Sequence, residues 1–257
     1  MFISIVTVVY NGEKTIRKTI ESILCQEFKD YEYIIVDGLS KDNTVNIARE
    51  YERLFEGRLR IYSEPDKGIY DAMNKGIKLA KGDYIWLVNA DDWIEKDALS
   101  NINNYILNNR IGDETILAGW MNLVNMNTYE VVKVGKISRE LFESACKKLK
   151  MGVCHPATIV PKTIYDKVGM FDERYYISAD IDFILRCYQA NVNFDFPPII
   201  LTNMTDGGVS HQFPIKKNIH DFKLRVNKFC KNPFLRIYYM SIFTVKFLLI
   251  KLRGKYL

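Results

Sequence analysis

The first third of the chain alternates between short apolar runs and stretches in which apolar residues recur every three or four positions. A short apolar run is typical of a buried strand, whereas the longer spacing is typical of an amphipathic helix. Strands and helices that alternate through short connections indicate right-handed crossovers and a mainly parallel sheet. The pattern predicts strands at 3–9, 31–36, 58–62 and 84–88, separated by helices at 13–26, 41–55 and 69–80.

The second half of the chain is richer in predicted strands. An amphipathic helix begins at Ser178 or Asp180 and ends near Ala190. No linker rich in Gly, Ser or Pro separates the halves, so we expect an α/β fold with one mixed, mainly parallel sheet and helices on both faces. The other predicted elements are helices at about 95–108, 138–148 and 161–169, and strands at 115–124, 129–135, 155–160, 192–196 and 199–204.

The apolar run 84–88 ends in Asn89, Ala90, Asp91 and Asp92. Side chains at the carboxyl end of such a strand project into the crevice where open α/β sheets bind ligands. Two neighbouring carboxylates repel each other unless a cation or hydrogen bonds compensate them. Oxygen ligands of this kind suit Mg²⁺ or Mn²⁺ shared with substrate phosphates. The alternative is that Asp91 or Asp92 only caps a helix that starts near residue 93.

The other three predicted strands of the first third also end in polar clusters, each of which could be a simple turn. Parallel strands bring their carboxyl ends to one edge, and four such clusters fit a nucleotide, which needs acceptors for its base and ribose and a metal for its phosphates. The sequence contains neither G-x-G-x-x-G after the first strand nor G-x-x-x-x-G-K-[ST], so it has no glycine-rich phosphate site. The clusters are Thr7 to Asn11, Asp37-Gly38 and Ser63 to Asp66.

The net charge of +5 conceals an asymmetry. From Lys216 onward the chain has eleven Lys or Arg and one acid, Asp221. We therefore expect a basic, amphipathic helical tail, 214–257, after a domain at 1–213. Within it, 232–257 mixes aromatic and basic residues, and its longest uncharged run is shorter than the ~20 residues of a spanning helix. An anionic membrane surface is the expected partner, and a packed helix or a contact in a homodimer is the alternative.

The five cysteines are odd in number and have no C-x-x-C spacing, which indicates reduced thiols rather than disulfides or a zinc site. The chain shows no signal-peptide pattern. We therefore expect a cytoplasmic protein, peripheral on the inner face of the cell membrane, and no nucleic-acid partner.

Four segments of the chain resemble the family 2 glycosyltransferases, which have the GT-A fold: 4–11, 36–44, 64–76 and 82–92. The resemblance covers 1–213. It implies a nucleotide-sugar donor, most often a UDP-sugar, bound by 1–92, and an acceptor bound by 93–213. It also implies that Asp180 is the general base, although an acid at a helix start is most often a cap or a dipole partner.

The resemblance further implies that Asp37 lies near the base of the donor, Asp66 near the uridine, and that Asp91 is the metal-binding acid of the D-x-D motif. Asn89 stands where many members have the first Asp, so metal contact would rest on Asp91 with help from Asp92. His211 is a candidate third ligand, although a lone histidine is more often not one. The complete set of expected donor-binding residues is Thr7, Tyr10, Asn11, Asp37, Asp66, Gly68, Asn74, Asn89 and Ala90.

The segment 207–210 resembles members that build bacterial surface polysaccharides. The expected reaction is the transfer of one sugar, of the hexosyl type, to a glycan or lipid-linked acceptor with inversion. Two rivals remain. One is a sugar nucleotidyltransferase, and the other is a non-catalytic carbohydrate- or membrane-binding protein that has kept the fold.

Overall fold

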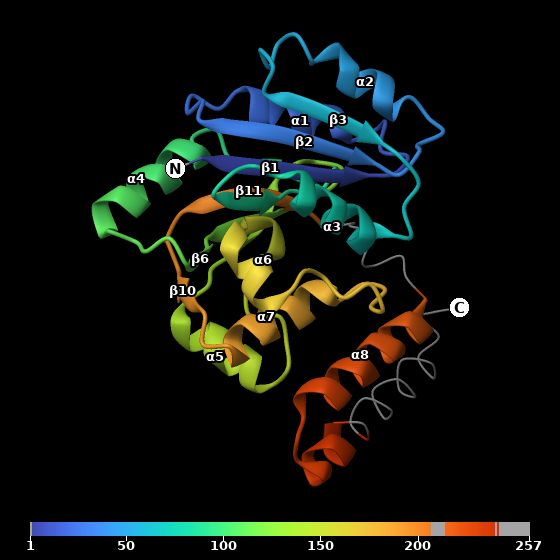
Figure 1. Cartoon of the computed structure of the whole chain (residues 1–257), viewed down its shortest axis with the longest axis vertical. Coiled ribbons are helices and arrows are strands. Elements are labelled where there is room, and N and C mark those ends of the chain that lie inside the picture. The colour runs from blue at the N-terminus through green and yellow to red at the C-terminus, as the bar shows by residue number, and fades with distance from the viewer. Residues whose placement is uncertain (1, 207–213, 240, 242–257) are drawn as a thin grey trace.

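The computed structural model describes residues 2–206, 214–239 and 241 (Figure 1). Its main feature is a seven-stranded sheet of order β10-β6-β9-β4-β1-β2-β3, in which β4, β1, β2 and β3 are parallel. The large, mainly parallel sheet of the prediction is confirmed. The strands are β1 (Ile3–Val9), β2 (Tyr31–Asp37), β3 (Leu59–Ser63), β4 (Tyr84–Leu87), β6 (Thr115–Ala118), β9 (Thr158–Pro161) and β10 (Asn193–Asp195).

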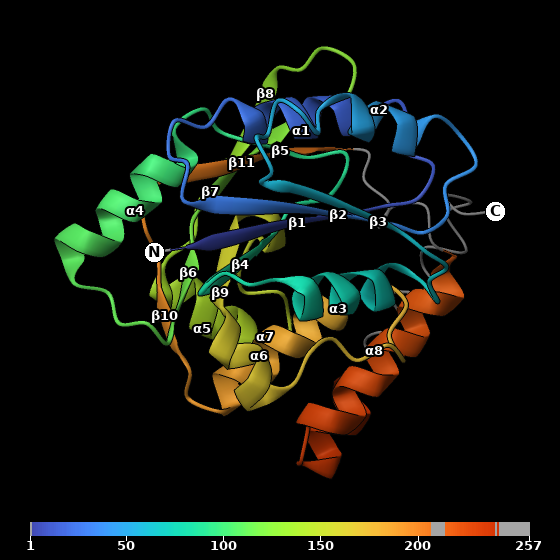
Figure 2. The same ribbon diagram turned by 45° about the horizontal axis from the view of Figure 1, so that its top comes forward.

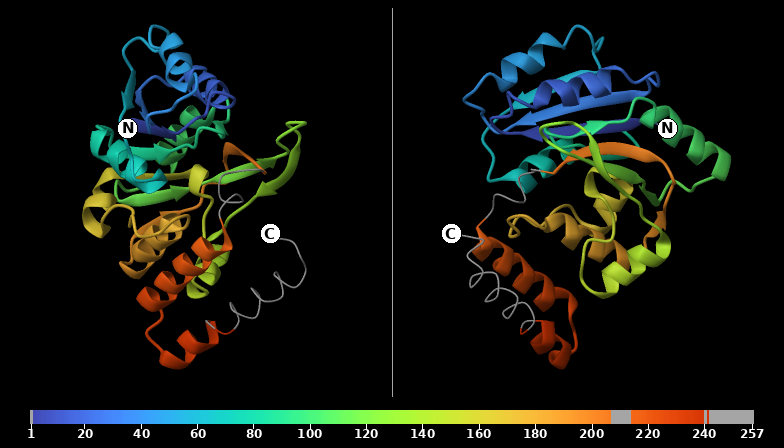
Figure 3. Two further views of the ribbon diagram at one scale, coloured as in Figure 1. Left: turned by 90° about the vertical axis from the view of Figure 1, so that its right-hand side faces the viewer. Right: turned by 180° about the vertical axis from the view of Figure 1, so that it is seen from behind.

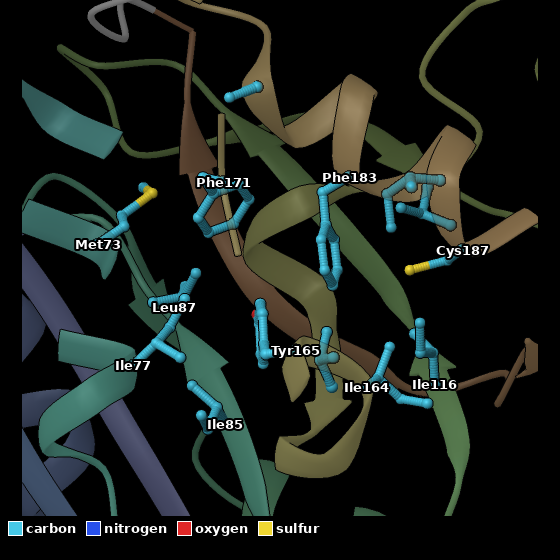
Figure 4. Close-up of a cluster of buried hydrophobic side chains, with 14 of the residues drawn as sticks. Met73, Ile77, Ile85, Leu87, Ile116, Ile164, Tyr165, Phe171, Phe183 and Cys187 are labelled. Carbon is cyan, nitrogen blue, oxygen red and sulfur yellow. The ribbon is translucent and has the colours of Figure 1, made fainter. Parts of the chain in front are cut away.

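Helices cover both faces of this sheet, as Figure 2 shows. Successive side chains of β1 point to opposite faces, so Ile3 and Ile5 pack with α1 and α2 while Val6 and Val8 pack with α3. Figure 4 shows the second of these cores, where Tyr165 stacks on Phe183 at 4.8 Å between ring centres. The helices are α1 (Ile16–Leu24), α2 (Thr44–Glu50), α3 (Ile69–Leu79), α4 (Ala98–Asn109), α5 (Arg139–Lys147), α6 (Lys162–Val168) and α7 (Ala179–Gln189).

A second sheet of four strands corrects the expectation of a single sheet. The predicted strand 115–124 is broken at Gly119, and its two parts belong to different sheets. A Cβ atom on Gly119 would lie 2.5 Å from Leu201 Cδ1 and 3.0 Å from the carbonyl oxygen of Ile199, so this approach needs glycine. The second sheet has the order β5 (Trp93–Ile94), β11 (Ile200–Thr205), β7 (Trp120–Val124) and β8 (Val131–Gly135).

The helix α8 (Ile215–Phe229) lies against α7, as Figures 1 and 3 show. Its inner face includes the buried residues Asp221, Val226 and Phe229. The start of the predicted tail is therefore packed on the body. A short helix at 233–239 follows, and its Phe234 is 81% exposed. Among the residues that the structure describes, no helix has the length and hydrophobicity needed to cross a membrane.

Candidate functional site

The acidic pair Asp91 and Asp92 lies in the connection from β4 to β5. Since Trp93 begins a strand and α4 begins only at Ala98, no helix starts near residue 93. The alternative that these residues cap a helix is therefore wrong. They instead follow a strand in the middle of the main sheet, between β1 and β9.

Asp92 is 1% exposed, and no Lys, Arg or His of the described residues forms an ion pair with it. The amide nitrogen of Asn89 donates to its Oδ2 at 2.9 Å, while its buried Oδ1 has no hydrogen-bond partner among the described residues. Burial, and then the charge of Asp91, raise the pKa of Asp92 to about 8. A buried carboxylate in this state retains its proton at neutral pH unless a cation approaches.

Asp91 is half-buried, and burial raises its pKa as well. The unpartnered oxygen of Asp92 next to Asp91 fits a divalent cation that takes oxygen ligands and shares the rest of its coordination with substrate phosphates and water. No group of three or more His, Cys, Asp or Glu suited to a metal occurs in the described part of the chain. The expected third ligand, His211, lies outside the described residues.

The strand ends of β2 and β3 bring Asp37 and Asp66 together. Asp37 is buried and accepts hydrogen bonds from the Ser40 backbone at 3.1 Å and from Ser63 Oγ at 2.6 Å. A Cβ atom on Gly38 would lie 2.2 Å from Asp66 Oδ2, so the carboxylate rests directly on the glycine backbone. The expected donor acids therefore lie side by side.

The loops after β1 and β2 are tied to one another. The backbone nitrogen of Asn11 donates to Ser40 Oγ, and Lys41 donates its backbone N–H to Asn11 Oδ1, each at 2.8 Å. Asn11 has a φ of 52°, a left-handed conformation that asparagine tolerates. The preceding Tyr10 is exposed, and its ring is free to meet a planar ligand.

Four further donor-binding predictions fall in different settings. Gly68, exposed, has a φ of 131° and donates its N–H to Asp66 Oδ1 at 2.9 Å. The carbonyl of Ala90 accepts from Thr19 Oγ1 at 3.0 Å. Thr7 and Asn74 are buried, and their side chains bond to Tyr33 and to the backbone of residue 171. Their contact with a donor stays a prediction.

Asp180 is the second residue of α7, and the N-cap position belongs to Ser178. Its Oδ1 accepts from the backbone of Ile181 at 2.8 Å and lies 3.5 Å from the hydroxyl of Tyr70. Tyr70 follows Gly68 closely at the start of α3, so this contact brings Asp180 to the edge that carries Asp66. Burial raises the pKa of Asp180, which makes it a better proton acceptor than an ordinary aspartate.

Two residues near Asp180 were not predicted from the sequence: Tyr70 and His155. His155 precedes β9, which runs antiparallel to β4, so it lies near the end of β4 that leads to Asp91. Burial lowers the pKa of His155, and the negative charge of Asp180 opposes that effect. The one sequence signal for Tyr70 was its position two residues after Gly68, which could have indicated that it lies near the donor-binding residues.

Known proteins with the same fold were found by sequence and by structure. The sequence pattern of the family "Glycosyl transferase family 2" matches residues 4–169. A PGL/p-HBAD biosynthesis glycosyltransferase of Mycobacterium bovis is 30% identical over 186 residues, 72% of this chain and 69% of its own. An uncharacterised glycosyltransferase of Methanocaldococcus jannaschii is 31% identical over 198 residues, 75% of this chain and 67% of its own.

The structure of TarS from S. aureus superposes with a TM-score of 0.68 at 18% identity, and the match covers 93% of this chain but 41% of TarS. TarS 1–349 in complex with UDP-GlcNAc superposes with a TM-score of 0.69 at 18% identity, and the match covers 95% of this chain and 72% of TarS 1–349. A mannosyltransferase of Pyrobaculum calidifontis, in complex with GDP-Man and Mn²⁺, superposes with a TM-score of 0.63 at 14% identity. The match covers 90% of this chain and 64% of the mannosyltransferase. These likenesses support the GT-A fold, and the sequence matches show that the chain belongs to glycosyl transferase family 2.

Proposed function

We propose that the protein transfers one sugar from a UDP-sugar to a hydroxyl of a glycan or lipid-linked acceptor, with inversion at the anomeric carbon. The observation that carries this proposal is the buried, unpartnered oxygen of Asp92 beside Asp91, at the edge that also holds Asp37, Asp66 and Asp180. The UDP-GlcNAc in TarS 1–349 supports the choice of donor class.

Asp91 and Asp92 would hold Mn²⁺ or Mg²⁺, which when bound neutralises charge on the leaving diphosphate. His211 is the proposed third ligand. Asp37 and Asp66 offer carboxylate oxygens to the base and ribose of the donor. Because these acids lie at the ends of neighbouring strands, they bind the nucleotide where the sheet itself holds them in place.

Asp180 accepts the proton of the acceptor hydroxyl as that oxygen bonds to the anomeric carbon and the bond to the diphosphate oxygen breaks. A single base on the face opposite the leaving group produces inversion. The raised pKa of Asp180 favours proton uptake, and the contact with Tyr70 orients its carboxylate.

The test has two stages. Isothermal titration of UDP with and without Mn²⁺ shows whether the site binds a nucleotide through a metal. A screen of UDP-glucose, UDP-galactose, UDP-GlcNAc and GDP-mannose for donor hydrolysis then identifies the sugar. Metal-dependent UDP binding with hydrolysis of a UDP-sugar supports the proposal. UDP binding without hydrolysis of any donor would favour a non-catalytic binding protein, and formation of a nucleotide-sugar from a sugar phosphate would favour the nucleotidyltransferase.

A role in bacterial surface polysaccharide synthesis, at the inner face of the membrane, is part of the same proposal. It is supported by the basic charge after residue 216 and by the exposed side chains Phe234 and Ile237. Truncation after Cys230 should release the protein from anionic liposomes and preserve donor hydrolysis, because α8 stays in place. Equal sedimentation of both forms would instead favour a packing role or a contact between two copies of the chain.

A further inference from the structure

The acid Asp221 stands alone among the basic residues of α8, and the reaction described above does not use it. It is 2% exposed. Its carboxylate accepts hydrogen bonds from the backbone nitrogens of Tyr176 at 3.0 Å, Ile177 at 2.8 Å and Ser178 at 3.1 Å. The hydroxyl of Ser178 donates to it as well, at 3.2 Å. One buried anion thus binds the segment that enters α7.

A second contact lies two turns further along the same face of α8. Lys228 Nζ is 2.6 Å from Asp182 Oδ1 and 3.7 Å from Asp172 Oδ2. Asp182 is fully buried, and its other oxygen accepts from Arg186 Nε at 2.8 Å. Residues at i and i+7 share one face of a helix, so Asp221 and Lys228 contact α7 together.

Asp180 lies between these two contacts. Asp221 holds residues 176–178 before it, and Lys228 holds Asp182 after it. The first turn of α7 therefore cannot tilt or slide without breaking a buried charge contact, which is costly. A displacement of about 1 Å at a reacting group can cost roughly 100-fold in rate.

Arg225 occupies the middle of the same face of α8. Its charge lowers the pKa of Asp180, against the larger effect of burial, which raises that pKa. The guanidinium therefore favours the ionised form that a base needs before the acceptor arrives.

We propose that α8 is a positioning element for the general base, in which Asp221 and Lys228 hold the first turn of α7 so that Asp180 faces the acceptor hydroxyl. The proposal rests on the proposed function for the role of Asp180. It places two determinants of acceptor activation, Asp221 and Lys228, outside residues 4–169.

The test compares Asp221→Asn and Lys228→Met with Lys223→Met, an exposed lysine of the same helix. Asn keeps one acceptor oxygen but turns an NH₂ group toward backbone donors. We expect kcat for transfer to fall about 10–100-fold in the first two variants, with KM for the donor and UDP affinity unchanged. Asp221→Glu should recover part of the loss, and Lys223→Met should behave as the wild type.

Hydrogen exchange gives a readout that is independent of catalysis. The amides of residues 176–182 should exchange faster in Asp221→Asn, whereas those of α1 and α3 should not. A variant with a lower melting temperature but unchanged exchange at 176–182 and an unchanged kcat would overturn the positioning role. A different result is faster exchange in Asp221→Asn together with normal transfer by Asp180→Asn. This result would overturn Asp180 as the base, although Asp221 would still hold residues 176–178. Lys228→Met supplies the answer if Asp221→Asn does not fold.

Discussion

Two pairs of carboxylates in this protein combine a buried member with a half-buried one. After β4 they are Asp92 and Asp91, and in α7 they are Asp182 and Asp180. Asp182 is compensated within the chain by Arg186 and Lys228, at 2.8 and 2.6 Å. Among the residues that the structure describes, no cation contacts Asp92. The amide of Asn89 and the backbone of Thr205 favour its ionised form, yet burial raises its pKa to about 8.

The contrast separates a structural carboxylate from one prepared for a ligand. Burying a carboxylate costs several kcal/mol unless opposite charge and hydrogen bonds compensate it. In α7 the protein supplies both cations, and the pair belongs to the fold. After β4 no cation of the described residues compensates Asp92, which stays protonated at neutral pH unless a cation approaches, and this supports the proposal that the pair holds a metal.

The largest expected effect is the loss of transfer activity on substitution of Asp180, the half-buried carboxylate in α7. Asp180→Asn preserves the shape of the side chain, so folding and UDP binding should remain close to wild type. Transfer should fall by about 10²–10⁴-fold, because Asn cannot take up the proton of the acceptor. The transfer rate, measured beside the melting temperature, decides the matter. Near-normal transfer would remove Asp180 as the base.

Substitution of Asp182, the buried carboxylate in α7, should lower the free energy of unfolding. Asp182→Ala removes the buried carboxylate that Arg186 and Lys228 share, and we expect a loss of about 3 kcal/mol in the free energy of unfolding. Glu143→Gln is the matched control, since it removes an i,i+4 pair with Lys147 that is exposed to solvent. Urea denaturation measures both. Equal, small losses in the two variants would show that the buried pair contributes no more than a surface one.

Asp92, the buried carboxylate after β4, should make the free energy of unfolding depend on pH. Its pKa, about 8 in the folded protein, exceeds the ordinary 3.8, so between these values the folded state holds a proton that the unfolded chain has lost. Stability without metal should therefore fall as the pH rises, by about 2 kcal/mol from pH 6 to pH 8. Asp92→Asn should flatten this decline relative to wild type and to the exposed control Asp97→Asn. Parallel pH profiles in all three proteins would contradict the uncompensated state of Asp92.

The smallest expected effect concerns Asp91. We expect Mn²⁺ to strengthen UDP binding about 10-fold in the wild type, equivalent to about 1.4 kcal/mol, and Asp91→Ala to abolish that gain. Calorimetry with and without a chelator measures it. If a chelator leaves the affinity of the wild-type protein for UDP unchanged, the metal role of this pair is wrong.

Periodicity alone predicted most of the main sheet, because a buried strand or helix face is a local property of the sequence. The strand at 3–9 has the predicted bounds. The break at Gly119 was missed, since it depends on Leu201, which is distant in the sequence. The roles of the site residues stay predictions, and the sequence did not indicate which carboxylate forms an ion pair with a basic side chain of the protein. That distinction between Asp92 and Asp182 arises from contacts such as Lys228 with Asp182, which no local pattern contains.

The order of the elements has a consequence for synthesis on the ribosome. The strands β1 to β4 emerge first and can pair through short crossovers, but β4 keeps an open edge until β9 has left the exit tunnel. Asp91 and Asp92 thus follow a strand that is unprotected for part of translation. The contacts of α7 with Lys228 form later still, so Asp91 and Asp92 are synthesised well before Asp180, the proposed base, is held in place.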